Sequence, residues 1–273
     1  ISRKINEMQN KEHILQDLVK IIIPIYKIDL NHYEMISLGQ LVQVLKDYPK
    51  VIIKPFGLDI EPILDKFENQ FHVQDFDDHY FSDIAGYNRL MLTPEFYKQF
   101  IDTKYILIYQ LDAFVFRDEL NYWCKLDYDY IGAPWLCKLK YERGFMKLFL
   151  RTRGLIYSLL KIKHRQQCFY RVGNGGFSLR KTEVFYKIAI EKQEVIRNYL
   201  KHVSKSSQFN EDVFWGLEAT KDKKFLVPTW QEALFFSFDL FPEIAYCKNG
   251  KRLPFGCHRW NKELDFWNKY IEL

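Results

Sequence analysis

The amino-acid sequence predicts an α/β protein, a single Rossmann-like domain around a mostly parallel sheet. From about residue 18 onward, short apolar runs alternate with segments of helical periodicity. Strands that alternate with helices are connected as βαβ units, which build parallel sheets. The chain has 273 residues, of which 48% are hydrophobic, so it can bury one large core and a generally disordered state is excluded.

The first half of the chain alternates four predicted strands with helices. Each strand is a short apolar run that ends at a proline or a polar residue, and the four runs cover 18–26, 51–55, 71–75 and 105–112. Apolar residues repeat at about the 3.6-residue period of a helix over 31–47, 60–67, 82–88 and from Pro94 onward. Ser82 or Asp83 is the expected N-cap of its helix.

Beyond residue 112 the predicted elements are less regular. We expect strands over 113–116, 128–135 and 175–179, helices over 118–125, 182–199 and 212–218, and a mixed strand region over 226–238. Asn210 is the expected cap of the helix over 212–218. The chain is therefore predicted to be one domain over 1–273, with halves 18–137 and 172–273 separated by an insertion over 138–171.

The insertion over 138–171 differs in composition from the rest of the chain. It holds ten Lys and Arg residues against one acid, Glu142, a net charge of +9, whereas the whole chain carries +5. Apolar side chains are interleaved with these charges, which predicts a basic amphipathic helical segment, broken at Gly154. Such a segment favours an anionic membrane surface, from which it would deliver an acceptor to a neighbouring site. A solvated helical hairpin is the alternative, and no nucleic-acid-binding motif is recognisable.

The cysteine count and the apolar runs indicate the compartment. The five cysteines include no CxxC pair, so a disulfide framework or a structural zinc site is not expected, and a reducing compartment is favoured. No signal peptide is recognisable, and the apolar runs are too short to span a bilayer. We therefore expect a cytoplasmic protein, peripheral on the inner face of the membrane. The chain begins with Ile1 rather than Met, so we expect a trimmed protein or a piece of a longer one.

Four polar features carry the candidate chemistry: Asp112 at the end of the fourth strand, the Gly-Asn-Gly-Gly stretch 173–176, the pair Glu211 and Asp212, and His258. Ligands of α/β proteins bind at the carboxyl ends of strands. Carboxylate and imidazole groups bind divalent cations, glycines let the backbone approach a ligand, and a positioned carboxylate accepts a proton. Each feature has an ordinary alternative: a turn-capping acid, a tight turn, acids at a helix N-terminus, or a packed histidine.

The four features together meet the needs of sugar transfer from a nucleotide diphosphate, and their order resembles the GT-A glycosyltransferases. That family carries an acidic DxD at a strand end, a glycine-rich loop, an xED triplet and a late histidine. The corresponding stretches here are 110–112 (Gln-Leu-Asp), 173–177 (Gly-Asn-Gly-Gly-Phe), 210–212 (Asn-Glu-Asp) and His258. The amino-acid sequences of 109–116, 132–135 and 254–258 are similar to those of an uncharacterised bacterial family that is grouped with these enzymes. The resemblance covers the chain from Leu18 to Trp260 and implies a GT-A-like domain.

The resemblance assigns a role to each matching residue. Asp112 and His258 would bind a manganese or magnesium ion. Asp212 would be the catalytic base of an inverting enzyme, and Glu211 would support it or bind the acceptor. The residues expected to contact the nucleotide-sugar donor are Gln110, Asp112, Asn174, Gly175 and Gly176, with Asn88 as a further candidate. The first DxD position holds Gln110 rather than an acid, so a bound cation would have one carboxylate fewer. Arg259 or Lys262 is the alternative partner of the diphosphate.

The predicted activity is transfer of a hexose from a UDP-linked donor to a hydroxyl of a cell-surface glycan or a lipid-linked acceptor. Two alternatives stay open. A nucleotidyltransferase would also bind nucleotide and metal, although the glycine- and lysine-rich loop expected near its first strand is missing here. The second alternative is a non-catalytic module that binds a nucleotide sugar or a glycan. In that case Gln110 would indicate a metal site that has been lost.

Overall fold

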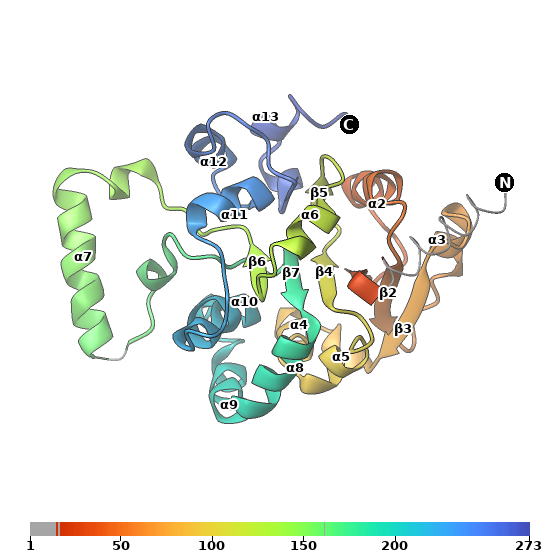
Figure 1. Ribbon diagram of the computed structural model, residues 1–273, viewed down its shortest axis with the longest axis horizontal. Coiled ribbons are helices and arrows are strands. Elements are labelled where there is room, and N and C mark those ends of the chain that lie inside the picture. The colour runs from red at the N-terminus through yellow and green to blue at the C-terminus, as the bar shows by residue number, and fades with distance from the viewer. Residues whose placement is uncertain (1–14, 16, 161) are drawn as a thin grey trace.

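A computed structural model describes residue 15 and the ranges 17–160 and 162–273. Within these ranges the centre of the protein is a six-stranded sheet in the order β3-β2-β1-β4-β7-β6 (Figure 1). Its strands are β1 (Val19–Pro24), β2 (Lys50–Pro55), β3 (His72–Phe76), β4 (Tyr105–Tyr109), β6 (Tyr130–Gly132) and β7 (Phe177–Lys181). The first four run parallel, and β7 runs antiparallel to β4 and β6. The predicted α/β fold with a mostly parallel sheet is confirmed.

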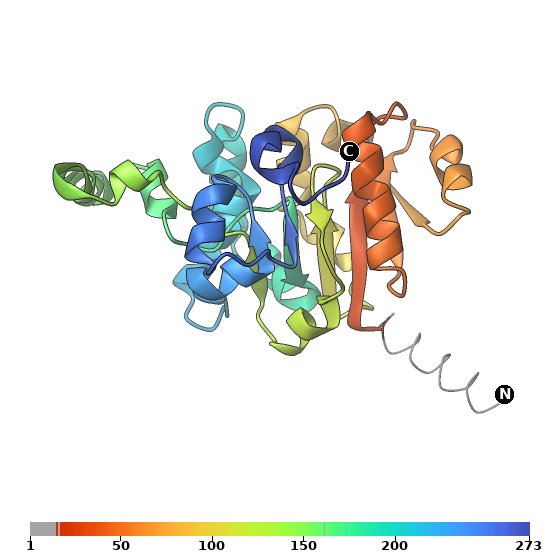
Figure 2. The same ribbon diagram turned by 90° about the horizontal axis from the view of Figure 1, so that it is seen from above.

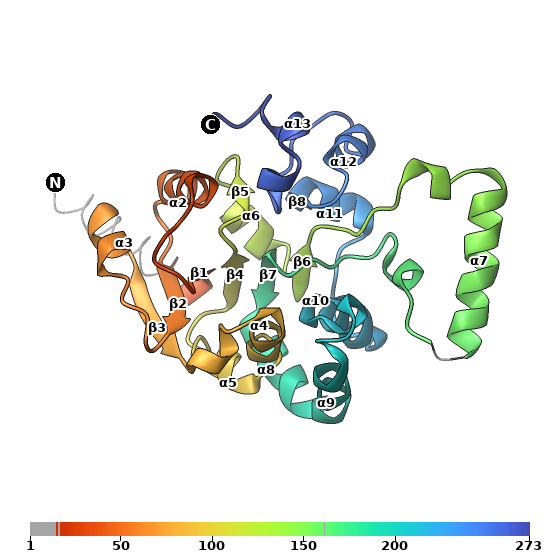
Figure 3. The same cartoon turned by 180° about the vertical axis from the view of Figure 1, so that it is seen from behind.

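Alternate residues of the strands serve two cores, because successive side chains point to opposite faces of a sheet. On β1, Ile21 and Ile23 pack with Leu41 on one face, whereas Ile22 packs with Phe96 on the other. The first face is covered by α2 (His32–Val44), α3 (Glu61–Lys66), α6 (Leu120–Lys125) and α11 (Trp230–Phe236). The second is covered by α4 (Ile84–Leu90), α5 (Pro94–Lys98), α8 (Thr182–Glu191) and α9 (Gln193–His202). Figure 3 shows the same two layers from behind.

A second sheet brings the end of the chain back to the centre. It consists of β5 (Phe114–Val115), β9 (Gly256–Cys257) and β8 (Ser237–Phe238), and it packs with α12 (Pro242–Lys248) and α13 (Leu264–Trp267) around a third core. Strands β5 and β9 pair antiparallel, with Phe114 opposite Cys257. Because of this register, His258 lies beside the turn that precedes β5.

Two predicted segments differ from the structure. Residues 226–238 are mainly helix α11 rather than strand, because Thr229 and Glu232 form a capping box that starts the helix. Residues 182–199 are two helices rather than one, since the backbone leaves the helical conformation at Lys192. This break lets α9 turn and pack against α4.

The insertion contains one continuous helix of 16 residues, α7 (Gly144–Leu159). The predicted break at Gly154 is wrong, because a single glycine costs a helix only about 1 kcal/mol relative to alanine. Seen from above, α7 stands clear of the body, at the end of the molecule opposite α3 and β3 (Figure 2). The chain then returns to β7 through the short helix η3 (Arg165–Cys168). None of the helices in the described ranges has the length and apolar content needed to cross a bilayer.

Candidate functional site

A cavity of about 960 Å³ opens at the carboxyl ends of β1 and β4. Its lining includes Asp112, Asn174, Glu211, Asp212 and His258, so the four polar features of the sequence share one space. The remaining residues with an expected role, Asn88, Gln110, Gly175 and Gly176, line the same cavity. Segments separated by up to about 170 residues therefore converge where ligands bind in α/β sheets.

Asp112 lies in a turn rather than at the strand end that the sequence predicted. Strand β4 ends at Tyr109, and the Ala113 N–H donates to the Gln110 carbonyl at 2.8 Å to close the turn. The Gln110 N–H donates to the Gly176 carbonyl at 2.9 Å, which ties this turn to the glycine-rich loop. The turn projects the Asp112 carboxylate into the cavity instead of leaving it in the plane of the sheet.

His258 is buried between two acids from distant parts of the chain, Asp112 and Asp239. Its Nε2 lies 3.0 Å from Asp112 Oδ1 and 3.1 Å from Gln110 Oε1, and its Nδ1 lies 3.2 Å from Asp239 Oδ1. Burial lowers the pKa of His258, but the two carboxylates outweigh it and raise the pKa to about 10. Burial likewise raises the pKa of Asp112, and His258 outweighs it, so that the pKa of this carboxyl is lowered.

The donor atoms around His258 have the chemistry of a partial cation site. Asp112 presents a carboxylate oxygen at 3.0 Å and Gln110 an amide oxygen at 3.1 Å from the imidazole Nε2 atom of His258. Asp239 stands behind the imidazole, as carboxylates do behind metal-binding histidines. Within the described ranges, no group of three or more His, Cys, Asp or Glu side chains is arranged to hold a metal ion. Because magnesium is usually held by one or two carboxylates with substrate phosphates and water, these donors fit a cation that a diphosphate helps to bind.

The glycine-rich loop is shaped by two close approaches. A Cβ on Gly176 would lie 2.1 Å from His258 Nε2, and a Cβ on Gly175 would lie 1.9 Å from Glu211 Oε1. Between Gly173 and these glycines, Asn174 adopts a left-handed φ of 58°, which asparagine tolerates better than most residues. The loop is glycine-rich because functional side chains from elsewhere fill the space that its own side chains would need.

Glu211 is held in the site by a buried ion pair. Its Oε1 accepts from Arg180 Nη2 at 3.0 Å, and the Arg180 side chain is fully buried on β7. Arg180 also donates to the Tyr97 hydroxyl at 3.0 Å. The other carboxylate oxygen of Glu211 is buried without a hydrogen-bond partner among the described residues. A buried ion pair is stable only when its groups also have good hydrogen-bond geometry, as Arg180 has with Glu211 and Tyr97. Arg180 therefore fixes the position of the Glu211 carboxylate.

Asp212, the next residue, has a different environment. Helix α10 (Glu211–Val213) begins here, although the expected Asn210 cap makes no side-chain hydrogen bond, and Asp212 Oδ1 accepts from the Val213 N–H at 2.8 Å. Burial and the neighbouring Glu211 raise the pKa of Asp212 to about 7. A carboxyl with this pKa exchanges a proton readily near neutral pH, as a catalytic base must.

Asn88 supports the site from helix α4. Its Oδ1 accepts from the Glu211 N–H at 2.6 Å, and its Nδ2 donates to the Ile84 carbonyl at 2.7 Å. Both ends of the amide are therefore engaged with the backbone, and Asn88 positions the start of α10. Contact between Asn88 and the nucleotide-sugar donor stays a prediction.

Two residues of the site escaped the sequence analysis, Arg180 and Asp239. Arg180 shares a face of β7 with Ser178, and both are fully buried. Two polar residues at alternate positions of a predicted strand, Ser178 and Arg180, would have been the signal. Asp239 directly follows β8, the kind of strand-end position that drew attention to Asp112.

Replacing Gly175 by alanine should separate Glu211 from Arg180, because the new Cβ would overlap the Glu211 carboxylate. We expect a loss of about 1–3 kcal/mol in the free energy of unfolding, measured by urea denaturation. Gly39→Ala is the matched control, since a Cβ there meets nothing within 4 Å and helix α2 should gain up to about 1 kcal/mol. Equal stability of the two variants would contradict the close packing of the loop.

Residues 70–258, more than two thirds of the chain, match the family described as "Protein of unknown function (DUF5672)". No curated protein matches the chain.

Solved structures of glycosyltransferases share its fold at low sequence identity. An active-site mutant of LgtC matches with a TM-score of 0.52 and 14% identity over 88% of this chain and 86% of that one. GlyE of Streptococcus pneumoniae matches with a TM-score of 0.51 and 12% identity. The match covers 94% of this chain and 61% of GlyE. The resemblance predicted from the motifs is confirmed. The chain belongs to the DUF5672 family and has the fold of the GT-A glycosyltransferases.

Proposed function

We propose that the protein transfers a hexose from a nucleotide-diphosphate donor, UDP-linked, to a hydroxyl of a cell-surface glycan or a lipid-linked acceptor. The observation that carries this proposal is the convergence of Asp112, Glu211, Asp212 and His258 on one cavity. LgtC, whose fold is similar, is a galactosyltransferase solved with donor and acceptor sugar analogs. The activity fits a cytoplasmic enzyme at the inner face of the membrane, with 18–137 as the half that binds the nucleotide and 172–273 as the half that binds the acceptor.

The leaving diphosphate requires positive charge. Four basic side chains line the cavity: Lys27, Arg165, Arg259 and Lys262. Asp112 and His258 would hold a manganese or magnesium ion, with Gln110 as a neutral oxygen ligand, and the ion would neutralise charge on the diphosphate as it leaves. Asn174, Gly175 and Gly176 would lie along the donor, where the glycines let the backbone come close to the sugar.

The acceptor hydroxyl must lose its proton. Asp212 is the base in this proposal, because its carboxylate lines the cavity and its pKa is raised to about 7. The unpaired oxygen of Glu211 would accept a hydrogen bond from a substrate hydroxyl. Direct attack on the donor sugar would invert its anomeric configuration, which NMR of the product would reveal.

Asp112→Ala should lower sugar transfer about a hundredfold or more, because several kcal/mol of charge stabilisation at the diphosphate are lost. Release of nucleoside diphosphate measures the reaction, and thermal melting checks the fold. Asp222→Ala removes an exposed acid outside the cavity and should leave turnover unchanged. Full activity of Asp112→Ala would refute its role. Donor binding without turnover in the unmodified protein would favour a binding module, and pyrophosphate release from a nucleoside triphosphate would favour a nucleotidyltransferase.

Turnover should rise with pH through about 7, because the Asp212 carboxyl has to be ionised to accept a proton. Between about pH 6 and pH 8 we expect roughly a tenfold increase. Asp212→Asn should lose about 10²–10⁴-fold in turnover and show no such rise. A variant that keeps the pH profile of the unmodified protein would show that another group is the base.

Melting of the protein with a panel of nucleotide sugars, with and without manganese, tests donor and metal together. A UDP-sugar at about a hundred times its Kd should raise the Tm by roughly 5–10 °C in the presence of manganese. Asp112→Ala should lose the part of the shift that depends on manganese. If the shift is equal with and without manganese, the diphosphate is held by Arg259 or Lys262 instead of a metal ion.

A further inference from the structure

Helix α7 carries an apolar face that the described part of the chain leaves uncovered. Its apolar residues recur at steps of three and four, which places them along one side of the helix. They are Phe145, Leu148, Phe149, Leu155, Ile156 and Leu159. Phe145 is 80% exposed and Leu159 is 83% exposed, more than any large apolar side chain among the described residues outside the insertion, where Ile84 reaches 76%.

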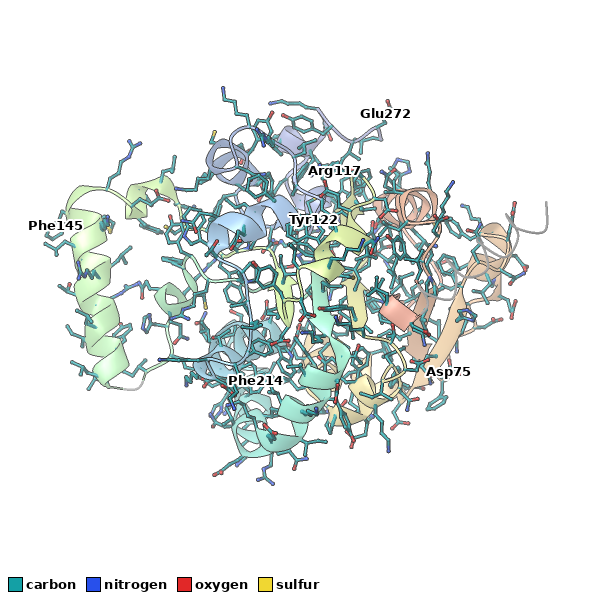
Figure 4. The ribbon with its side chains drawn as sticks, viewed as in Figure 1. Asp75, Arg117, Tyr122, Phe145, Phe214 and Glu272 are labelled. Atoms are coloured by element: carbon teal, nitrogen blue, oxygen red, sulfur yellow. The ribbon has the colours of Figure 1, made fainter. Side chains whose placement is uncertain are left out.

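The opposite side of α7 faces the protein. Leu150 and Tyr157 are partly buried there, and the Tyr157 ring packs edge-on against His164 at 5.5 Å, just before η3. The apolar face is therefore turned away from the body. Figure 4 labels Phe145 at this outer edge of the molecule. Soluble surfaces rarely keep a contiguous apolar face of this kind unless something binds it.

Basic residues border the apolar face on both edges. Lys147 and Arg151, four positions apart, follow one edge, and the Arg153 guanidinium lies 5.8 Å from the Phe149 ring at the other. The single acid of the insertion, Glu142, is already paired with Lys248 at 3.1 Å. An apolar stripe between rows of Lys and Arg is the pattern of a helix that lies in the interface of an anionic bilayer.

We propose that α7 docks on an anionic lipid surface, with its apolar face in the bilayer interface and Lys147, Arg151 and Arg153 at the headgroups. A second copy of the chain is a poorer partner for this face, because pairing two copies would bring two insertions of like charge together. Nucleic acid is also a poorer partner, since phosphate contacts would leave the apolar face in water.

Both ends of the insertion that carries α7 lead to the cavity. The chain enters the insertion from Trp135 and Leu136 and leaves it through Arg165 and Phe169, and all four residues line the cavity. A surface bound by α7 is thereby tethered to the site at both ends of the insertion. The acceptor assigned by this geometry is a lipid-linked one, a conclusion that rests on the proposed sugar transfer, whereas the docking itself does not.

Sedimentation with vesicles tests the docking on the full chain. Vesicles of phosphatidylcholine with phosphatidylglycerol should bind the protein, vesicles of phosphatidylcholine alone should bind it far more weakly, and high salt should release it. Lys147→Gln with Arg151→Gln should lower the partition coefficient roughly 20- to 30-fold. The matched control, Lys223→Gln with Lys224→Gln on an exposed loop, should change it less than about twofold.

The apolar contribution is tested separately. Leu148→Ser with Leu159→Ser should lower the partition coefficient about tenfold or more, and Ile101→Ser with Leu126→Ser, exposed elsewhere on the body, should not. Equal binding to both vesicle types, no binding, or unchanged binding by either α7 variant overturns the proposal. A dimer in sedimentation velocity that Leu148→Ser with Leu159→Ser dissociates would instead assign the face to a second copy.

The melting panel separates this inference from the proposed function. Vesicle binding without stabilisation by any nucleotide sugar would leave the docking surface intact and remove sugar transfer. Stabilisation by a nucleotide sugar without vesicle binding would support sugar transfer and remove the docking surface. With both present, faster transfer to a lipid-linked acceptor than to its water-soluble headgroup supports delivery by α7, and equal rates overturn it.

Discussion

The site depends on one imidazole placed between two carboxylates. Asp112 comes from the turn after β4, Asp239 follows β8, and His258 follows β9. The two carboxylates on either side of this imidazole would repel each other, and the imidazole, protonated as long as no cation is bound, offsets that repulsion. The small second sheet sets the arrangement, because the His258 N–H donates to the Phe238 carbonyl at 2.8 Å and the β5–β9 register places His258 beside Asp112. Sheet pairing and the electrostatics of the site therefore stabilise each other.

A second buried ion pair, between Arg180 and Glu211, gives the adjacent acids Glu211 and Asp212 different environments. Glu211 is paired with Arg180, while Asp212 lines the same cavity and accepts a hydrogen bond from the Val213 N–H. Neighbouring carboxyl groups take different roles when their environments differ, and here one is fixed as a charged acceptor and the other has its pKa raised to about 7. The fully buried Arg180 lies on β7, which runs antiparallel to both of its neighbours, so this strand supplies the cation that holds Glu211.

The insertion follows a different physical rule from the rest of the molecule. In the body, apolar side chains meet across the two faces of the sheet, and the three cores account for them. In α7 they face outward between basic residues, where burial against the protein gives them no stabilisation. A helix of this composition is stable next to the body only through its inner side and its two connections, and the outward side is left for a partner.

The sequence by itself determined the class of the fold and the identities of most site residues. Alternating apolar runs and helical periods predicted the sheet and its parallel order, because side-chain periodicity is a local property. The order of Asp112, the loop 173–176, Asp212 and His258 predicted which residues would meet. Local patterns failed where packing or capping overrode them, as at 226–238, where a capping box made a helix of residues that resemble a strand.

Only the tertiary structure decided the chemistry of each group. Arg180 and Asp239 acquire their roles from partners far away in the chain, Glu211 and His258, and no local pattern contains that information. The direction in which the apolar face of α7 points also came from the structure, since periodicity defines a face without saying what it meets. The physical reason is the same in each case: charge, burial and exposure depend on neighbours in space, and the fold alone chooses those neighbours.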